Sequence, residues 1–330
     1  MPVKLTCFAS LLTALSIVSS TCVSPAQARP ALSIDVETGA VIASHDKDRS
    51  WHPASVTKLM TAAVALEAVR AGRLTLDTPI VFTENATRTP PSKLGLKAGK
   101  SLPLRDALRI MLTRSMNDVA VAIAETIAGS EATFARLMNL KAASLGMHGT
   151  RFVNASGLHD PGQVSTAADL ALLGRHILLE FPESASLFGI PSVTYGGKTL
   201  RNTNGLVGHY EGVQGMKTGY VCASGFNLVG LASRGSRRVL TVVLGAPNAR
   251  TREKETAYLF EQAFANTSSG PKLTSNATSP ATAIDLRTKA CGKNLGESFK
   301  IDTGPSATPL PVTKPARKWN IAGDLEDYGG

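Results

Sequence analysis

Residues 53–61 of this 330-residue chain read Pro-Ala-Ser-Val-Thr-Lys-Leu-Met-Thr and place a serine, Ser55, three positions before a lysine, Lys58. The residues that follow are rich in Ala and Leu and contain neither Gly nor Pro before Gly72, which predicts a helix over about residues 55–70. Positions i and i+3 of a helix share a face, with Cβ atoms about 5–6 Å apart. Ser55 and Lys58 are therefore expected to meet where the helix begins, at the positive end of its dipole.

This serine–lysine pair has the composition of a nucleophile and its base. A serine hydroxyl attacks only when a nearby base takes its proton, and a lysine serves as that base when burial or a neighbouring cation lowers its pKa. The spacing alone is not specific, because Ser-x-x-Lys recurs at 269–272 in a stretch rich in Ser and Pro. Taken alone, the pair is an ordinary solvated helix start, and the rest of the chain has to decide between the two interpretations.

A second polar motif, Ser115-Met116-Asn117, falls in the turn between two predicted helices. The hydroxyl can relay a proton, and the carboxamide can hold a carbonyl or amide of a substrate. The alternative is that one of the two side chains caps a helix, which is a common use of Ser and Asn.

A third motif, Lys217-Thr218-Gly219-Tyr220, lies on a predicted strand late in the chain. The lysine supplies a positive charge, the threonine hydroxyl can bind a carboxylate, and the glycine lets a substrate backbone approach closely. The alternative is an edge strand whose solvated lysine opposes aggregation.

Hydrophobic periodicity predicts strands at both ends of the sequence and helices between them. The predicted strands are 31–36, 40–44, 212–221, 225–232 and 238–245. The predicted helices are 104–113, 117–128, 131–145, 165–179 (with Ser165 as its cap) and 252–265. The expected fold class is therefore α+β, with one antiparallel sheet built from both ends of the chain, flanked by helices and carrying an inserted helical lobe.

The N-terminus has the pattern of a secretory signal peptide over residues 1–28. Lys4 precedes an apolar run at 11–18, and Ala26-Gln27-Ala28 provides a cleavage site after Ala28. The alternative is an uncleaved membrane anchor. Removal of the signal leaves Cys222 and Cys291 in an oxidising compartment, where they form either one disulfide or two separate buried thiols.

Composition limits the partners and the boundaries. The net charge of +10 favours acidic partners, but no clustered basic stripe is present, so no nucleic acid is expected. Cysteine and histidine spacing predicts no zinc site, and no cofactor or metal is expected. From residue 266 the chain is rich in Ser, Thr, Pro, Asn and Gly, which predicts a catalytic domain at 29–265 and a mostly disordered, low-complexity tail at 266–330.

The three motifs, in this order behind an export signal, resemble those of penicillin-binding proteins and class A β-lactamases. The chain is most similar to the D-alanyl-D-alanine carboxypeptidase family of low-molecular-weight penicillin-binding proteins, and the resemblance covers about residues 30–265. Further matching stretches are 94–99, 157–160 running into Ser165, and 212–219. The resemblance implies a β-lactamase/D,D-peptidase-like fold with its site between the sheet and the helical lobe.

The same resemblance implies a serine-type carboxypeptidase that removes the terminal D-Ala from peptidoglycan stem pentapeptides. Ser55 would form the acyl-enzyme, Lys58 would be the general base and Ser115 would pass a proton to the leaving amine. The implied substrate-binding residues are Asn117, Lys217, Thr218, Gly219, Tyr220 and Arg252. Among these, Thr218 and Arg252 (or its neighbour Arg250) would bind the terminal carboxylate, and the backbone N–H groups of Ser55 and Tyr220 would form an oxyanion hole.

The implied partners are stem peptides ending in D-Ala-D-Ala and β-lactam antibiotics as covalent inhibitors, met in the periplasm or cell-wall space. Many family members carry a second β-rich domain and an amphipathic membrane-binding helix. The tail of this chain shows neither clearly, so membrane association is doubtful.

Three other functions share part of this pattern. A D,D-endopeptidase that cuts peptide cross-links has all three motifs. A β-lactamase is less favoured, because no Glu-x-x-x-Asn deacylation element lies between Ser115 and Lys217. A non-catalytic cell-wall-binding module is opposed by the intact serine and lysines. Two departures from the family pattern are Gln214, where Asp is frequent, and Tyr220, where His is frequent.

Overall fold

The computed structural model describes residues 29–266 and 270–291. The expected signal peptide, and the tail beyond residue 291, lie outside these residues. Within the described ranges, no helix is both long enough and apolar enough to cross a membrane.

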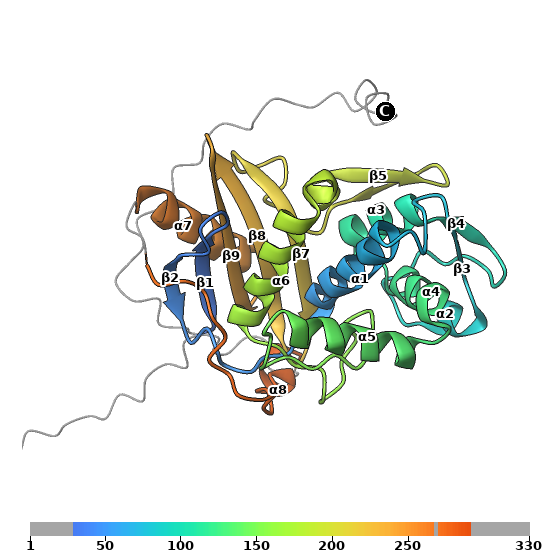
Figure 1. The fold of residues 1–330 in the computed structure, drawn as a ribbon, viewed down its shortest axis with the longest axis horizontal. Coiled ribbons are helices and arrows are strands. Elements are labelled where there is room, and N and C mark those ends of the chain that lie inside the picture. Colours follow the sequence, from blue (N-terminus) through green and yellow to red (C-terminus); the bar gives the residue numbers. More distant parts are fainter. Residues whose placement is uncertain (1–28, 267–269, 292–330) are drawn as a thin grey trace, which may run out of the picture.

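A five-stranded antiparallel sheet is built from both ends of the chain, as the sequence predicts (Figure 1). Its strands are β1 (Ala31–Asp35), β2 (Val41–His45), β7 (Val213–Val221), β8 (Gly225–Arg234) and β9 (Arg237–Ala246). Their order across the sheet is β2-β1-β9-β8-β7, which leaves β2 and β7 as the two edges. Two small two-stranded sheets, β3 (Pro79–Val81) with β4 (Ser101–Pro103) and β5 (Ser192–Tyr195) with β6 (Lys198–Arg201), stand apart from it.

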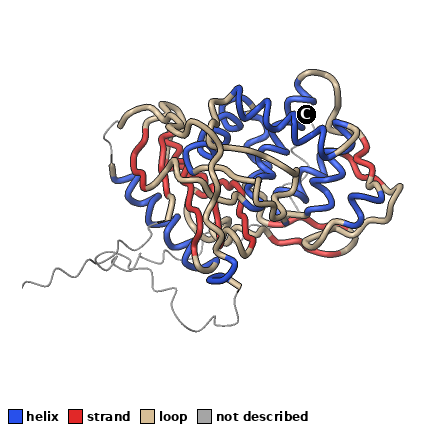
Figure 2. Tube along the Cα trace, turned by 90° about the horizontal axis from the view of Figure 1, so that it is seen from below, coloured by secondary structure: helices blue, strands red, loops and turns tan. Residues whose placement is uncertain are grey.

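The helices form a lobe beside the sheet and a cover on each of its faces (Figures 1 and 2). The lobe consists of α1 (Lys58–Arg70), α2 (Glu84–Arg88), α3 (Leu104–Arg114), α4 (Asn117–Ala128) and α5 (Glu131–Ser144). The sheet is covered by α6 (Ala167–Glu180) and α7 (Ala249–Ala265). Short 3₁₀ turns η1 (Ala54–Thr57) and η2 (Pro182–Phe188) and the short helix α8 (Arg287–Ala290) complete the described elements.

The two covering helices pack on opposite faces of the sheet, and adjacent residues of β8 show this. A Cβ added to Gly174 of α6 would lie 3.5 Å from the side chain of Val229, whereas one added to Gly230 would lie 3.0 Å from both Thr256 and Phe260 of α7. Successive strand residues point to opposite faces. Because both faces are covered, the central strands read as nearly continuous apolar runs rather than as alternating ones.

Helix α1 runs through the middle of the lobe and is buried on almost every side. This explains why its sequence is mostly apolar and has no distinct polar face, since a helix surrounded by protein has no solvent face. The residue pair of interest lies where α1 begins, against strand β7. The α+β class expected from the sequence is thus confirmed, and the sheet and the lobe meet at the N-terminus of α1.

Two local expectations are wrong. Ser55 lies in the 3₁₀ turn η1 and not in the first turn of an α-helix, which begins at Lys58. The pairing survives because residues i and i+3 eclipse one another in a 3₁₀ turn. The N-cap of α6 is Thr166, whose side chain accepts from the Asp169 N–H; the Ser165 hydroxyl is instead bonded to Thr150.

The boundary expected at residue 265 is also wrong, because residues 270–291 pack on the domain. The Pro271 carbonyl accepts from the Val41 N–H at 2.9 Å, and Leu273 and Leu286 are buried. A disulfide joins Cys222 to Cys291, which confirms the bridged alternative. The composition of this segment does not predict its packing, because it contains no periodic apolar run. A few widely spaced apolar side chains and one disulfide attach it to the domain.

Candidate active site

Ser55 and Lys58 meet as the sequence predicts. The Lys58 Nζ lies 2.9 Å from the Ser55 Oγ, and the lysine side chain is completely buried. Nζ also donates to the side-chain oxygen of Asn117 at 2.8 Å and to the backbone carbonyl of Ser156. Three oxygens, from η1, from α4 and from a distant loop, therefore surround the Lys58 amine.

The surroundings of Lys58 favour the neutral amine. Burial is the main cause that holds the Lys58 pKa well below its usual value, and the neighbouring cation Lys217 lowers it further. The carboxylates of Asp118 and Glu131 oppose this shift. A neutral lysine amine within hydrogen-bond distance of a serine hydroxyl is the arrangement that general-base activation requires.

Gly157 and Gly219 both lie in close contact with the backbone of the Ser55 turn. A Cβ on Gly157 would lie 2.0 Å from the Ala54 carbonyl oxygen, and one on Gly219 would lie 2.7 Å from the Pro53 carbonyl oxygen. Gly157 also has a φ of +82°, and Ala54 itself is held at +49°. We call this arrangement the glycine slot: the backbone of the Ser55 turn lies so close to Gly157 and Gly219 that neither position has space for a Cβ.

The second motif divides between two elements. Ser115 ends α3 in a left-handed conformation with φ +66°, and its hydroxyl has no hydrogen-bond partner among the described residues. Asn117 begins α4, where its N–H donates to Ser92 and its side-chain amide donates to Pro90. Asn117 is thereby locked toward Lys58, so the structure brings it into the site directly, while Ser115 stands at the turn beside it.

Lys217 is completely buried on edge strand β7 and donates to the Thr218 carbonyl at 2.9 Å. Burial is the main cause that lowers its pKa to about 7, with a further contribution from Arg252. On the same strand, Gly219 faces the Ser55 turn. Strand β7 therefore carries a positive charge and a smooth backbone along one side of the nucleophile.

A small polar cluster lies on the other face of β7. The Thr218 and Thr203 hydroxyls are 2.6 Å apart, and Arg252 donates to the Thr203 carbonyl at 3.3 Å. Arg252 is buried, and burial lowers its pKa, whereas Arg250 is exposed. Of the two arginines left open by the sequence, only Arg252 joins the cluster.

Tyr220 contributes its backbone to the β7 edge, and its ring turns the other way. The ring packs on Phe226, with centroids 4.2 Å apart, and its hydroxyl is 3.1 Å from the Sγ of Cys291. Tyr220 and Thr218 share one face of the strand, opposite Gly219. The replacement of the frequent histidine thus places an aromatic ring beside the disulfide and outside the Ser55 slot.

Sequence reasoning missed four contributors to this site. They are Thr203, the carbonyl of Ser156, and the two carboxylates Asp118 and Glu131. Asp118 is fully buried and accepts from the N–H groups of Leu94 and Gly95, which ties the start of the 94–99 stretch to the second motif. The acidic residue directly after Ser115-Met116-Asn117, and the polar run at 202–204, were the available signals.

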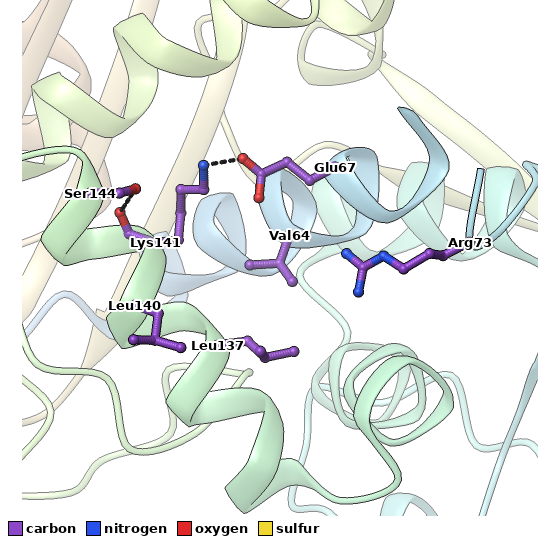
Figure 3. Close-up of a pocket in the computed structure, with 7 residues that line it drawn as sticks. All are labelled: Val64, Glu67, Arg73, Leu137, Leu140, Lys141 and Ser144. Carbon is purple, nitrogen blue, oxygen red and sulfur yellow. Dashed lines mark hydrogen bonds and ion pairs between the residues drawn. The ribbon is translucent and has the colours of Figure 1, made fainter. Parts of the chain in front are cut away.

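A hollow elsewhere in the molecule does not involve these residues. A groove of about 270 Å³ lies between α1 and α5, crossed by the Lys141–Glu67 ion pair (Figure 3). Its lining residues are Val64, Glu67, Arg73, Leu137, Leu140, Lys141 and Ser144. The volume of a groove therefore does not locate the active site here, whereas the arrangement of the reactive side chains does. The described residues also contain no group of three or more His, Cys, Asp or Glu side chains that could hold a metal ion.

The chain resembles known proteins in sequence and in fold. The family model described as D-alanyl-D-alanine carboxypeptidase matches residues 18–248, and the chain belongs to this family. Among curated relatives, the D-alanyl-D-alanine carboxypeptidase DacD of Escherichia coli is 36% identical over 234 residues, which are 69% of this chain and 60% of that protein. The chain thus spans somewhat less than two thirds of that relative's length.

Solved structures are similar in sequence and in fold. Penicillin binding protein 5 from Haemophilus influenzae is 32% identical, with a TM-score of 0.70 over 72% of this chain and 71% of that one. Penicillin-binding protein D2 from Listeria monocytogenes, solved in an ampicillin-bound form, is 36% identical, with a TM-score of 0.66 over 72% of this chain and 97% of that one. These neighbours share the penicillin-binding D,D-peptidase fold.

Proposed function

We propose that this protein is a serine-type D-alanyl-D-alanine carboxypeptidase that removes the terminal D-Ala from peptidoglycan stem pentapeptides. The observation that carries the proposal is the buried Lys58 amine, 2.9 Å from the Ser55 hydroxyl, at the junction of sheet and lobe. Family membership and the names of the relatives support it.

Acylation begins when neutral Lys58 takes the Ser55 proton as Oγ attacks the carbonyl carbon of the last peptide bond. The resulting oxyanion is bound by the backbone N–H groups of Ser55 and Tyr220, and loss of one such donor typically costs about 10²–10³ in rate. Ser115 donates its hydroxyl proton to the leaving nitrogen, assisted by the Lys217 charge, and in turn takes the former Ser55 proton from Lys58, which is thereby neutral again for deacylation. The C–N bond breaks, free D-Ala leaves and an ester on Ser55 remains.

Substrate binding uses the open edge of β7. An extended peptide lies along this strand, as ligands add to exposed sheet edges, and Gly219 permits close approach. Its terminal carboxylate binds Thr218 and Arg252 across the cluster that includes Thr203. Charge-assisted pairing with a buried arginine explains the requirement for a free C-terminus. Asn117 holds the amide of the acyl portion from the lobe side.

Deacylation reverses the proton path. Water enters, Lys58 takes its proton, and the hydroxide equivalent attacks the ester carbonyl, so that Ser55 regains its hydrogen and the shortened peptide leaves. β-Lactams react at the same serine, since their strained amide presents a carbonyl and a carboxylate together. The Listeria relative bound to ampicillin supports covalent inhibition of this chain.

Ser55→Ala tests the nucleophile. The variant is expected to lose all covalent labelling by a fluorescent penicillin and all D-Ala release while keeping the thermal unfolding temperature of the wild type. Ser144→Ala, which removes an exposed hydroxyl on α5, serves as the control and should label normally. Continued labelling of Ser55→Ala would exclude Ser55 as the nucleophile.

Defined muropeptides separate the carboxypeptidase from the closest alternative. Release of free D-Ala from a monomeric pentapeptide is the expected result. Conversion of cross-linked dimers to monomers without D-Ala release would identify a D,D-endopeptidase. Rapid turnover of penicillin would instead indicate a β-lactamase.

We also propose that the chain is exported and cleaved after Ala28. The Cys222–Cys291 disulfide supports an oxidising compartment, where such bridges persist. Arg29, the first residue of the expected mature chain, forms an ion pair with Glu255 of α7. N-terminal sequencing of the protein recovered from the periplasmic fraction should begin at Arg29; a Met1 start in that fraction would contradict the cleavage.

A further inference from the structure

The loop at 154–158 supports the catalytic amine from the side opposite Ser55. The Ser156 carbonyl accepts from Lys58 Nζ, and the residue before it is held at both of its backbone groups. The Ala155 carbonyl accepts from the Thr61 hydroxyl at 2.7 Å, and the Ala155 N–H donates to the Glu131 carboxylate at 3.0 Å. The position of the Ser156 oxygen therefore depends on two side chains, one uncharged and one acidic.

Glu131 is the first residue of α5, after the N-cap Ser130. Its carboxylate is half-buried and bonds to the 154–158 loop. An acidic residue in the first turn of a helix is normally exposed to solvent and interacts only with the helix dipole. Burial is the main cause that raises the Glu131 pKa; the Ala155 N–H and Lys58 oppose the rise, whereas Glu125 adds to it. The carboxylate is thus placed where its charge acts on Lys58.

The other carboxylate near Lys58 has a different task. Asp118 is fully buried and holds the N–H groups of Leu94 and Gly95. Its replacement would disturb the loop that carries those residues. Glu131 is the carboxylate whose charge can be removed while its single hydrogen-bonding oxygen is kept, because glutamine has the same shape and an acceptor oxygen.

We propose that Glu131 is a positioning residue for the base Lys58: it holds Ala155 so that the Ser156 carbonyl is aimed at the lysine amine, and it supplies a negative charge behind that amine. The inference rests on the proposed function, in which Lys58 is the base. Glu131 touches neither the substrate nor the reacting atoms and acts only through the loop and through its field.

The two parts of this role are separable by substitution. Glu131→Gln keeps the acceptor and removes the charge. Thr61→Val keeps the charge and removes the other anchor of Ala155. Glu125→Gln removes a neighbouring acidic charge on α4 whose carboxylate bonds Thr83 and Asn85 and not the 154–158 loop, so it is the matched control.

The test is the second-order rate of acylation by penicillin as a function of pH, with thermal unfolding of each variant measured in parallel. Removing an anion near Lys58 lets the amine lose its proton at lower pH. The rise of the acylation rate with pH on the acidic side of the profile, here called the acid limb, should therefore occur at lower pH in Glu131→Gln than in the wild type. Thr61→Val should keep the limb in place and lower the plateau rate about tenfold or more, as small misplacements of catalytic groups do. Glu125→Gln should change neither.

An acid limb for Glu131→Gln that coincides with the wild-type limb would overturn the inference, and a fall in unfolding temperature with an unchanged profile would assign Glu131 to the start of α5 alone. Wild-type protein that is not acylated at all would instead overturn the proposed function. In that event, titration of the Lys58 Cε resonance by ¹³C NMR in wild type and Glu131→Gln still decides the inference, since the amine should titrate at lower pH in the variant.

Discussion

The two edges of the sheet differ in what lies against them. At the β2 edge, residues 270–274 cover the start of the strand: Ala40 forms a bridge with Lys272, and Val41 donates to Pro271. At the β7 edge, no further strand is paired within the described residues, and the strand carries the lysine and glycine that face Ser55.

This difference shows two solutions to one problem. An unpaired edge invites association with other chains, and proteins usually blunt it or cover it. Here one edge is covered by the chain itself, and the other is the edge along which the proposed function places an extended peptide ligand. The open edge also holds the buried cation Lys217, whose amine donates to a backbone carbonyl and costs stability while it is charged. Substitutions at the β7 edge should therefore change activity first, and those at the covered edge should change stability first.

The largest effect is expected from Lys58→Met, which replaces the buried base by an apolar side chain of similar length. Acylation by penicillin should fall about 10²–10⁴-fold, as for loss of a general base. The variant should unfold at the same or a higher temperature, because a buried amine is removed. A variant that keeps wild-type acylation, or that unfolds well below the wild type, would break the proposed division between activity and stability.

The next effect is expected from Gly157→Ala, which inserts a methyl group against the Ala54 carbonyl. The displaced Ser55 should react about 100-fold more slowly with penicillin, as a misplacement of about 1 Å can cost that much. Gly235→Ala is the matched control: that glycine also has a positive φ, but nothing lies within 4 Å of the added Cβ. Equal rates for the two variants would show that the contact between Gly157 and the Ala54 carbonyl does not position Ser55.

A smaller effect is expected from pH through Lys217. Its pKa of about 7 in the free enzyme means that its positive charge is present below that pH and is lost as the pH rises. Because the charge attracts the substrate carboxylate, kcat/KM for a pentapeptide should fall above about pH 7. The corresponding fall in kcat should occur at higher pH, since the bound carboxylate stabilises the protonated form of Lys217. A flat kcat/KM profile from neutral pH upward would contradict this assignment.

The smallest effect on activity is expected from the Cys222→Ala/Cys291→Ala double variant. The bridge spans 69 residues, so its loss should destabilise the fold by about 2–4 kcal/mol. Acylation measured well below the unfolding temperature should change less than twofold, since neither sulfur contacts the Ser55 turn. A tenfold loss of acylation would instead place the disulfide among the determinants of the site.

Local sequence patterns predicted what depends on neighbours in the chain. The Ser55–Lys58 contact, the lobe helices, the antiparallel sheet and the alternatives for the cysteines follow from spacing and composition, whereas Arg252 and its alternative Arg250 came from the family resemblance. Contacts across long separations were not predictable in this way: Thr203 meets Thr218 at the edge of β7, and Glu131 reaches Ala155 only because α5 folds back on α1. The packed segment after residue 265 was missed because its polar composition concealed a few well-placed apolar side chains.

The glycine slot around Ser55 also limits how this protein can evolve. Every single substitution at Gly157 or Gly219 adds at least a Cβ, and at both positions that atom would lie against backbone, which has no alternative rotamer to adopt. We therefore expect that no single substitution at these two positions lowers reactivity toward an antibiotic while keeping the geometry of the Ser55 turn. Adaptive change that spares the native reaction has to arise at side chains around the slot, or in how much of the protein the cell makes.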